Sequence, residues 1–268
     1  MFDLACSRVQ VMGVLNVTPD SFSDGGHFIG LDAALRHVES MLAEGADMID
    51  IGGESTRPGA QDVLLADELV RVIPVLEAIK QRFGVAVSVD TSKAGVMQAA
   101  IAARADMIND VRALQEPGAL AACAASSVAV CLMHMQGQPR SMQHSPQYGD
   151  VVQDVADFFR ARIQACTEAG IGAGRLVLDP GFGFGKTLEH NLALLKHLDA
   201  LQVFGLPLLA GMSRKSMIGT LLGNRPVGGR LHGSVAAAVV AALKGARIVR
   251  VHDVGATVDA LKIVQAVL

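Results

Sequence analysis

Eight short apolar runs recur along the chain, and a stretch with helical spacing follows each of them. The runs are nearly continuous in hydrophobicity, as expected of parallel strands buried on both faces. Their positions are 9–17, 48–52, 85–89, 107–111, 128–133, 176–178, 206–210 and 248–251. The alternation predicts an α/β protein whose strands are parallel.

The segments between the runs carry apolar residues on one helical face. The clearest set is Leu65, Leu69, Val72, Leu76, Ile79 and Phe83, with Pro74 expected to kink that helix. A second set, Val152, Val155, Phe159, Ile163 and Cys166, ends near Gly170, which is suited to a C-terminal cap. Both segments support the β-then-α alternation.

Eight βα units in 268 residues match the size and count of a (β/α)₈ barrel. No linker or low-complexity segment divides the chain, so we expect residues 1–268 to form a single domain. A doubly wound open sheet is the alternative, because sequence alone does not show whether the first strand meets the last.

Composition limits the partners and the compartment. A net charge of −3 and the lack of a basic run disfavour nucleic acid and anionic membranes as partners. No apolar run approaches the roughly 20 residues of a membrane span. The cysteines, Cys6, Cys123, Cys131 and Cys166, show no C-x-x-C spacing and are interpreted as buried apolar residues in a reducing compartment. We therefore expect a cytoplasmic protein.

Polar residues follow the apolar runs, and in a barrel such strand ends meet at one mouth. They are Asn16, Glu54 to Arg57, Asp90, Asn109 and Asp110, His134, Asp179, Ser213 to Lys215, and Arg250 to Asp253. Any one of them could simply cap the next helix. All eight ends together predict a polar ligand, and Arg250 and His252, which alternate on one strand, suggest that it is an anion.

Two longer segments make a specific resemblance. Residues 16–26 (NVTPDSFSDGG) and 52–59 (GGESTRPG) are similar to the two signatures of the dihydropteroate synthase family. Further agreement comes from 87–91 (VSVDT), 108–110 (IND), 132–135 (LMHM), 178–186 (LDPGFGFGK), 211–216 (GMSRKS) and 250–253 (RVHD), whereas 223–229 departs from the family without touching a motif. The resemblance implies the same (β/α)₈ fold.

The family's reaction displaces diphosphate from 6-hydroxymethyl-7,8-dihydropterin diphosphate with the amine of 4-aminobenzoate, in folate biosynthesis. The resemblance implies that pterin is bound by Asp90, Asn109, Met133, Asp179, Phe184 and Lys215. It places diphosphate at Asn16, Arg250 and His252, with Asn16 also the ligand of a Mg²⁺ cofactor that borrows phosphate oxygens.

The arylamine is expected against Phe22, Thr56, Arg57, Pro58 and Ser216. Diphosphate loss ahead of amine attack would leave a cationic pterin methylene, which Asp90 or Asp24 would stabilise. Together with Lys215 and Arg250, these two are the expected catalytic residues. The Ala-rich stretch 234–243 is expected to pack in the barrel wall or at a subunit contact, and the family resemblance predicts a homodimer.

Three other functions compete with this interpretation. Residues 181–187 (GFGFGKT) resemble a phosphate-binding P-loop, but Pro180 stands where that motif needs a glycine and offers no N–H. A pterin-dependent methyltransferase would share the barrel and the pterin residues, but it has no use for a diphosphate site. A non-catalytic pterin-binding barrel is the third, because binding residues do not prove turnover.

Overall fold

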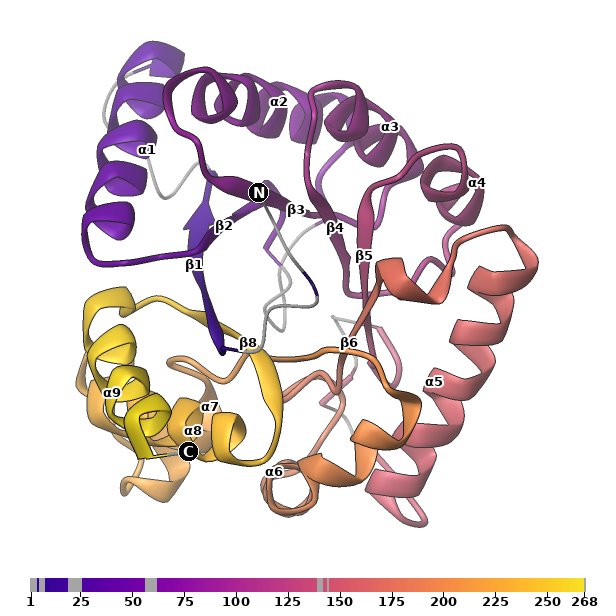
Figure 1. The fold of residues 1–268 in the computed structure, drawn as a ribbon, viewed down its shortest axis with the longest axis vertical. Coiled ribbons are helices and arrows are strands. Elements are labelled where there is room, and N and C mark those ends of the chain that lie inside the picture. Colours follow the sequence, from indigo (N-terminus) through magenta and orange to yellow (C-terminus); the bar gives the residue numbers. More distant parts are fainter. Residues whose placement is uncertain are drawn as a thin grey trace.

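The computed structural model describes residues 4, 8–18, 26–55, 62–138, 142–143 and 145–267. Eight parallel strands form the inner ring of this part of the chain, and helices surround it (Figure 1). The strands are β1 (Gln10–Asn16), β2 (Met48–Gly52), β3 (Ala86–Asp90), β4 (Met107–Asp110), β5 (Ala129–Met133), β6 (Leu176–Asp179), β7 (Leu208–Ala210) and β8 (Ala246–Val251). Each lies at an apolar run predicted from the sequence.

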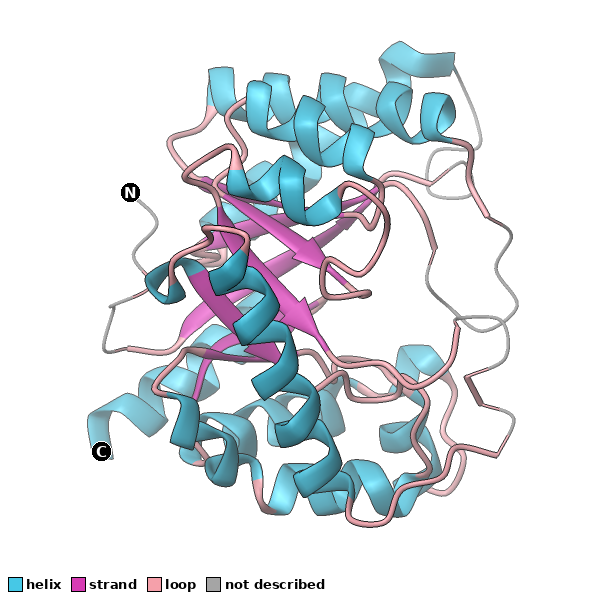
Figure 2. Cartoon of the chain, turned by 90° about the vertical axis from the view of Figure 1, so that its right-hand side faces the viewer, coloured by secondary structure: helices cyan, strands magenta, loops and turns pink. Residues whose placement is uncertain are grey.

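The sheet closes on itself, because β1 pairs with β2 on one side and with β8 on the other. The ladder between β1 and β8 runs from Gln10 opposite Ile248 to Gly13 opposite Val251. This closure confirms the (β/α)₈ barrel and excludes the open sheet. All strand arrowheads point toward one end of the barrel, away from the end at which the last helix finishes (Figure 2).

The helices pack outside the barrel and connect its strands. They are α1 (Gly26–Ala43), α2 (Leu65–Arg82), α3 (Ala94–Ala102), α4 (Ala119–Ala124), α5 (Val151–Glu168), α6 (Leu188–Lys196), α7 (Ser216–Leu221), α8 (Leu231–Leu243) and α9 (Val254–Val267), with short 3₁₀ turns η2 (Ala173–Arg175), η3 (Leu198–Phe204) and η4 (Val227–Gly229). Helix α2 continues through Pro74, so the expected kink does not end it. Gly170, after α5, has φ of +87° and ends that helix as predicted.

The core has two parts. A small cluster fills the barrel interior and includes Met12, Met48, Met107 and Leu209. A larger cluster lies between the strands and the surrounding helices, where Leu15, Ile51 and Phe159 are among its buried members. Met48 and Met107 are followed two positions later on the same strand by Asp50 and Asn109, so the interior changes from apolar to polar toward the mouth.

Cys123, Cys131 and Cys166 are buried and free, as predicted, whereas Cys6 lies outside the described residues. In the part of the chain that the structure describes, no helix combines the length and the apolar character needed to cross a membrane.

Candidate active site at the barrel mouth

Neighbouring strands place their last polar residues in one row. Asn16 of β1 lies opposite Gly52 of β2, Gly52 lies opposite Asp90 of β3, and Asp90 lies opposite Asn109 of β4. Gly52 has no side chain, and a Cβ atom there would lie 3.6 Å from Asn16 Oδ1 and 3.9 Å from Asp90 Oδ2. The glycine therefore leaves a small space flanked by an amide oxygen and a carboxylate oxygen.

Arg250 of β8 connects this row to a carboxylate deeper in the barrel. Its Nε donates to Asp50 Oδ2 over 2.6 Å, and its Nη2 donates to Asp90 Oδ2 over 3.1 Å. Asn109 Nδ2 donates to the same Asp50 oxygen over 3.3 Å. Asp50 is fully buried, and its Oδ1 has no hydrogen-bond partner among the described residues.

The carboxylates of Asp50 and Asp90 shift the pKa values of the groups in this half of the mouth. Burial raises the pKa of Asp90 to about 7, against the opposing effect of Arg250, and the neighbouring Asp50 raises it further. Burial alone would lower the pKa of Arg250, but Asp50 and Asp90 hold it above its usual value. Arg250 therefore stays charged, while Asp90 can exchange a proton near neutral pH.

The other half of the mouth contains Asp179 and Lys215. Burial raises the pKa of Asp179, although Lys215 opposes the shift, and Asp179 Oδ1 accepts a hydrogen bond from Gly181 N over 2.7 Å. Burial lowers the pKa of Lys215 to about 8, and Asp179 opposes that shift. Lys215 Nζ donates to Phe182 O and lies 4.5 Å from the centroid of the Phe184 ring. Asp179 and Lys215 therefore both bond to the Gly181–Phe182 backbone that follows β6.

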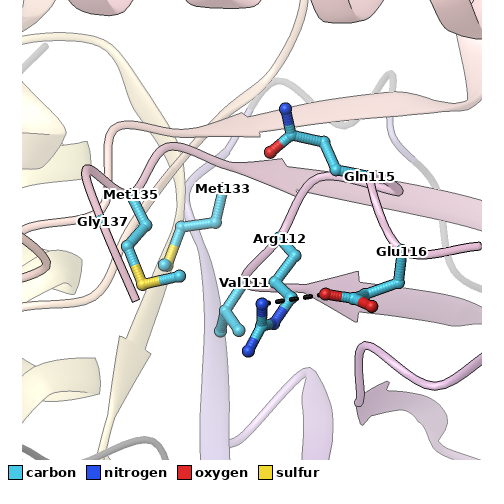
Figure 3. A pocket seen from close by; sticks show the side chains of 7 residues that line it. All are labelled: Val111, Arg112, Gln115, Glu116, Met133, Met135 and Gly137. Atoms are coloured by element: carbon cyan, nitrogen blue, oxygen red, sulfur yellow. Dashed lines mark ion pairs between the residues drawn. The ribbon is translucent and has the colours of Figure 1, made fainter. Parts of the chain in front are cut away.

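Met133, at the end of β5, lies opposite Asp179 of β6 and lines a pocket. Figure 3 shows Met133 and Met135 on one side of the pocket and Val111 with Arg112 on the other. Arg112 is paired with Glu116 over 2.8 Å. Met133 is buried, with 3% of its surface exposed.

His252 and Ser216 lie at the same end of the barrel but contact other groups. The backbone N and the Nδ1 of His252 each lie 3.1 Å from Ser213 Oγ, so this histidine contacts the segment between β7 and α7. Ser216 is the exposed first residue of α7, directly after Lys215. The remaining expected residues, Phe22, Asp24, Thr56, Arg57 and Pro58, lie outside the described residues.

Asp50 is a site residue that the strand-end pattern did not predict. That pattern covers polar residues at or just beyond the carboxyl ends of the strands, whereas Asp50 lies in the middle of β2, two positions before its last residue. A charged residue within a strand of a fully buried parallel sheet is rare unless it is paired. That anomaly, together with the two-residue alternation from Met48, would have pointed to it.

The fold and this mouth define the class of protein. The model of the pterin-binding enzyme family matches residues 12–252. The dihydropteroate synthase of Escherichia coli K12 is 56% identical over 265 residues, which cover 99% of this chain and 94% of that protein.

Solved structures agree. Yersinia pestis dihydropteroate synthase in complex with a sulfonamide drug is 60% identical, with a TM-score of 0.93 and coverage of 99% and 95% of the two chains. Burkholderia cenocepacia dihydropteroate synthase complexed with 7,8-dihydropteroate is 51% identical, with a TM-score of 0.89 and coverage of 97% and 92%. The chain belongs to the pterin-binding enzymes and, within them, to the dihydropteroate synthases, and it is a transferase.

Proposed function

We propose that the barrel mouth binds 6-hydroxymethyl-7,8-dihydropterin diphosphate and 4-aminobenzoate and condenses them to 7,8-dihydropteroate and diphosphate, a step of folate biosynthesis. The observation that carries this proposal is the arrangement of buried Asp50, Asn109 and Asp179 with Lys215 and Arg250 at one barrel end. A pterin presents donors and acceptors along the edge of a flat ring, and such an edge calls for carboxylate, amide and cationic partners in a confined slot.

The pterin edge is assigned to two carboxylates. Asp179 accepts paired hydrogen bonds from the pterin amino group and a ring N–H, which are of the stronger, charge-assisted kind. Asp50 Oδ1 is a further acceptor, because a buried carboxylate oxygen without a partner among the described residues gains most from a new donor. Asn109 donates and accepts, and Lys215 donates to ring acceptors.

The faces of the ring are assigned to Met133 and Phe184. Met133 lies opposite Asp179 in the ladder between β5 and β6, and Phe184 packs against the Lys215 ammonium. The polarizable Met133 suits the face of an aromatic ring.

Arg250, His252 and Asp90 are assigned to stabilise the charges that develop on the diphosphate and on the pterin methylene. Arg250 and His252 stabilise the departing diphosphate, because oriented cations and N–H donors favour a leaving group that gains negative charge. Asp90 stabilises the pterin methylene as it becomes cationic. A neutral arylamine then attacks this carbon, so the step requires no general base. The nitrogen of the new C–N bond then loses a proton, which passes to solvent or to diphosphate.

Mg²⁺ is the proposed cofactor. Oxygen atoms of Asn16 and Asp90 lie within 3.9 Å of the Cβ position at Gly52, and oxygen donors are of the type that Mg²⁺ prefers. Asn16 would hold the ion, which when bound neutralises part of the diphosphate charge. Tests of this assignment must include diphosphate, because it supplies most of the remaining ligands.

The arylamine is assigned to Phe22, Thr56, Arg57, Pro58 and Ser216, and Asp24 is proposed to support Asp90. The Yersinia pestis relative that binds a sulfonamide drug supports the further proposal that sulfonamides compete with 4-aminobenzoate here.

The remaining expectations extend the proposal to the whole molecule. Residues 1–268 are treated as one pterin-binding domain, since the family model spans nearly all of the barrel. A homodimer is proposed, with the exposed Val240 and Leu243 of α8 as its candidate contact. The buried free thiols are consistent with a reducing cytoplasm.

Calorimetry on two variants tests the proposed roles. Asp179→Ala should lose affinity for 6-hydroxymethyl-7,8-dihydropterin with and without diphosphate. Arg250→Ala should still bind the bare pterin but lose diphosphate-dependent affinity and turnover. Normal binding of the pterin diphosphate by both variants would refute the assignment.

A further inference from the structure

The glycine-rich segment after β6 does not present its lysine to a ligand. Lys186 occupies the position that a P-loop lysine would have, but its side chain is only 3% exposed. Its Nζ lies 2.8 Å from His134 Nδ1 and donates to Gly181 O and Phe184 O, each over 3.0 Å. These three partners account for the three ammonium protons, and the longer 3.3 Å contact to His134 O shares one of them.

His134 is suited to accept a hydrogen bond from the Lys186 ammonium. Burial lowers its pKa to about 3, and the charge of Lys186 contributes, so the imidazole is neutral and can offer a lone pair at Nδ1. Burying the ammonium is costly, and its own pKa falls to about 7 as a result. The hydrogen bonds to His134, Gly181 and Phe184 offset part of this cost.

The ammonium fastens the β6–α6 loop to the segment after β5. Gly181 has φ of +69°, and a Cβ atom there would lie 1.9 Å from His134 O. Gly185 has φ of +60°, and its Cβ would lie 2.3 Å from Gln136 O. The two backbones therefore lie in direct contact, and Lys186 bonds to both of them.

The same loop also contacts the pterin residues. Gly181 N donates to Asp179, Phe182 O accepts from Lys215, and the Phe184 ring lies beneath the Lys215 ammonium. Gly181 and Phe184 thus bond to Lys186 through their carbonyls while they contact the proposed pterin site through other groups.

We propose that Lys186, with His134, is a positioning residue for the reaction: it fixes the 181–185 loop so that Asp179 and Lys215 are held in their pterin-binding arrangement. The inference rests on the proposed function of those two residues. Lys186 does not touch the substrate, so its loss acts on pterin recognition as a whole and not on diphosphate in particular.

The test is the affinity of Lys186→Met for 6-hydroxymethyl-7,8-dihydropterin and for its diphosphate ester, measured by calorimetry well below the melting temperature. We expect both dissociation constants to rise about tenfold or more, because small displacements of binding groups are costly. The KM for 4-aminobenzoate should stay within about twofold. Lys186→Gln, which keeps an amide donor, should be intermediate, and it serves as the test variant if Lys186→Met does not fold.

Lys80→Met is the matched control. Lys80 is a partly buried lysine paired with Asp106 over 2.8 Å, next to the start of β4 and away from the mouth. Its loss should lower stability and leave both pterin affinities unchanged. Unchanged pterin affinity in folded Lys186→Met or Lys186→Gln overturns the inference, as does weakening of the diphosphate ester alone. Lys215→Ala tests the proposed function separately, because normal pterin binding in that variant would count against the role of Lys215 itself.

Discussion

Arg250 Nε and Asp50 Oδ2 are 2.6 Å apart, although 200 residues of chain separate the two residues. Arg250 lies on β8 and Asp50 on β2, and both strands pair with β1. The bond therefore spans the seam at which the barrel closes. Closure of the barrel therefore brings Arg250 next to Asp50.

Replacing Asp50 tests its assignment to the pterin edge. Asp50→Asn removes an acceptor beside Arg250 and should lower kcat/KM for the pterin diphosphate by about 10- to 100-fold, the equivalent of about 1.4–2.7 kcal/mol. The control is Asp47→Asn near the start of β2, where the carboxylate pairs with Arg8 and accepts from Val11 N over 2.9 Å. That variant should keep its kinetics, and equal kinetics in both variants would remove Asp50 from the site.

Asp90 gives a pH dependence with a defined sign. Its pKa is raised from 3.8 to about 7 in the folded protein, so between these values the folded state holds a proton that the unfolded state has lost. Stability from this group is complete at low pH and declines as pH rises through that window. Relative to Asp90→Asn, the unaltered protein should lose about 1–4 kcal/mol between pH 4 and pH 8, at about 1.4 kcal/mol per pKa unit.

Urea unfolding of both proteins across that range measures this difference, and acids far from Asp90 cancel because both proteins contain them. Parallel stability curves would show that the pKa of Asp90 is not raised by folding.

Gly181 is a test position for an alanine substitution, and Gly172 is its control. Gly181→Ala would force a left-handed alanine against His134 O and should cost about 2–4 kcal/mol. Gly172 has φ of −63°, and no atom lies within 4 Å of the place where a Cβ would stand, so Gly172→Ala should change stability by less than about 1 kcal/mol. Thermal unfolding of both variants measures the contrast, and a tolerated Gly181→Ala would mean that the loop does not lie against the segment after β5.

The buried thiols should be unreactive while the protein is folded. Burial raises the pKa of Cys123 to about 12 and also raises those of Cys131 and Cys166, which suppresses the reactive thiolate. In a Cys6→Ser variant, a thiol reagent should label all three only after urea is added. Rapid labelling of the native variant would contradict the described burial.

The sequence predicted the barrel well because each strand is marked by its own apolar run. Closure could not be read from it, since the pairing of β1 with β8 depends on contacts between the two ends of the chain. The strand-end rule located Asp90, Asn109 and Arg250, which the structure brings together. It failed for Asp50, whose position inside β2 departs from the rule that parallel strands are apolar.

The contacts made within the loops were harder to predict from the sequence than the strands. The sequence showed that Lys186 lies in a segment that resembles a P-loop but lacks its first glycine. The bonds of Lys186 to His134 and Phe184 depend on how two loops pack. Phe22, Asp24, Thr56, Arg57 and Pro58 stay predictions of the family resemblance, because they lie outside the described residues.

The most direct test of the account is product formation from 6-hydroxymethyl-7,8-dihydropterin diphosphate and 4-aminobenzoate, with and without Mg²⁺, with dihydropteroate and released diphosphate followed together. The account predicts that both products appear in equal amounts and that Mg²⁺ accelerates their formation. A protein that binds the pterin diphosphate but forms neither product would contradict it and leave a pterin-binding barrel, for which methyl transfer would be the next reaction to assay.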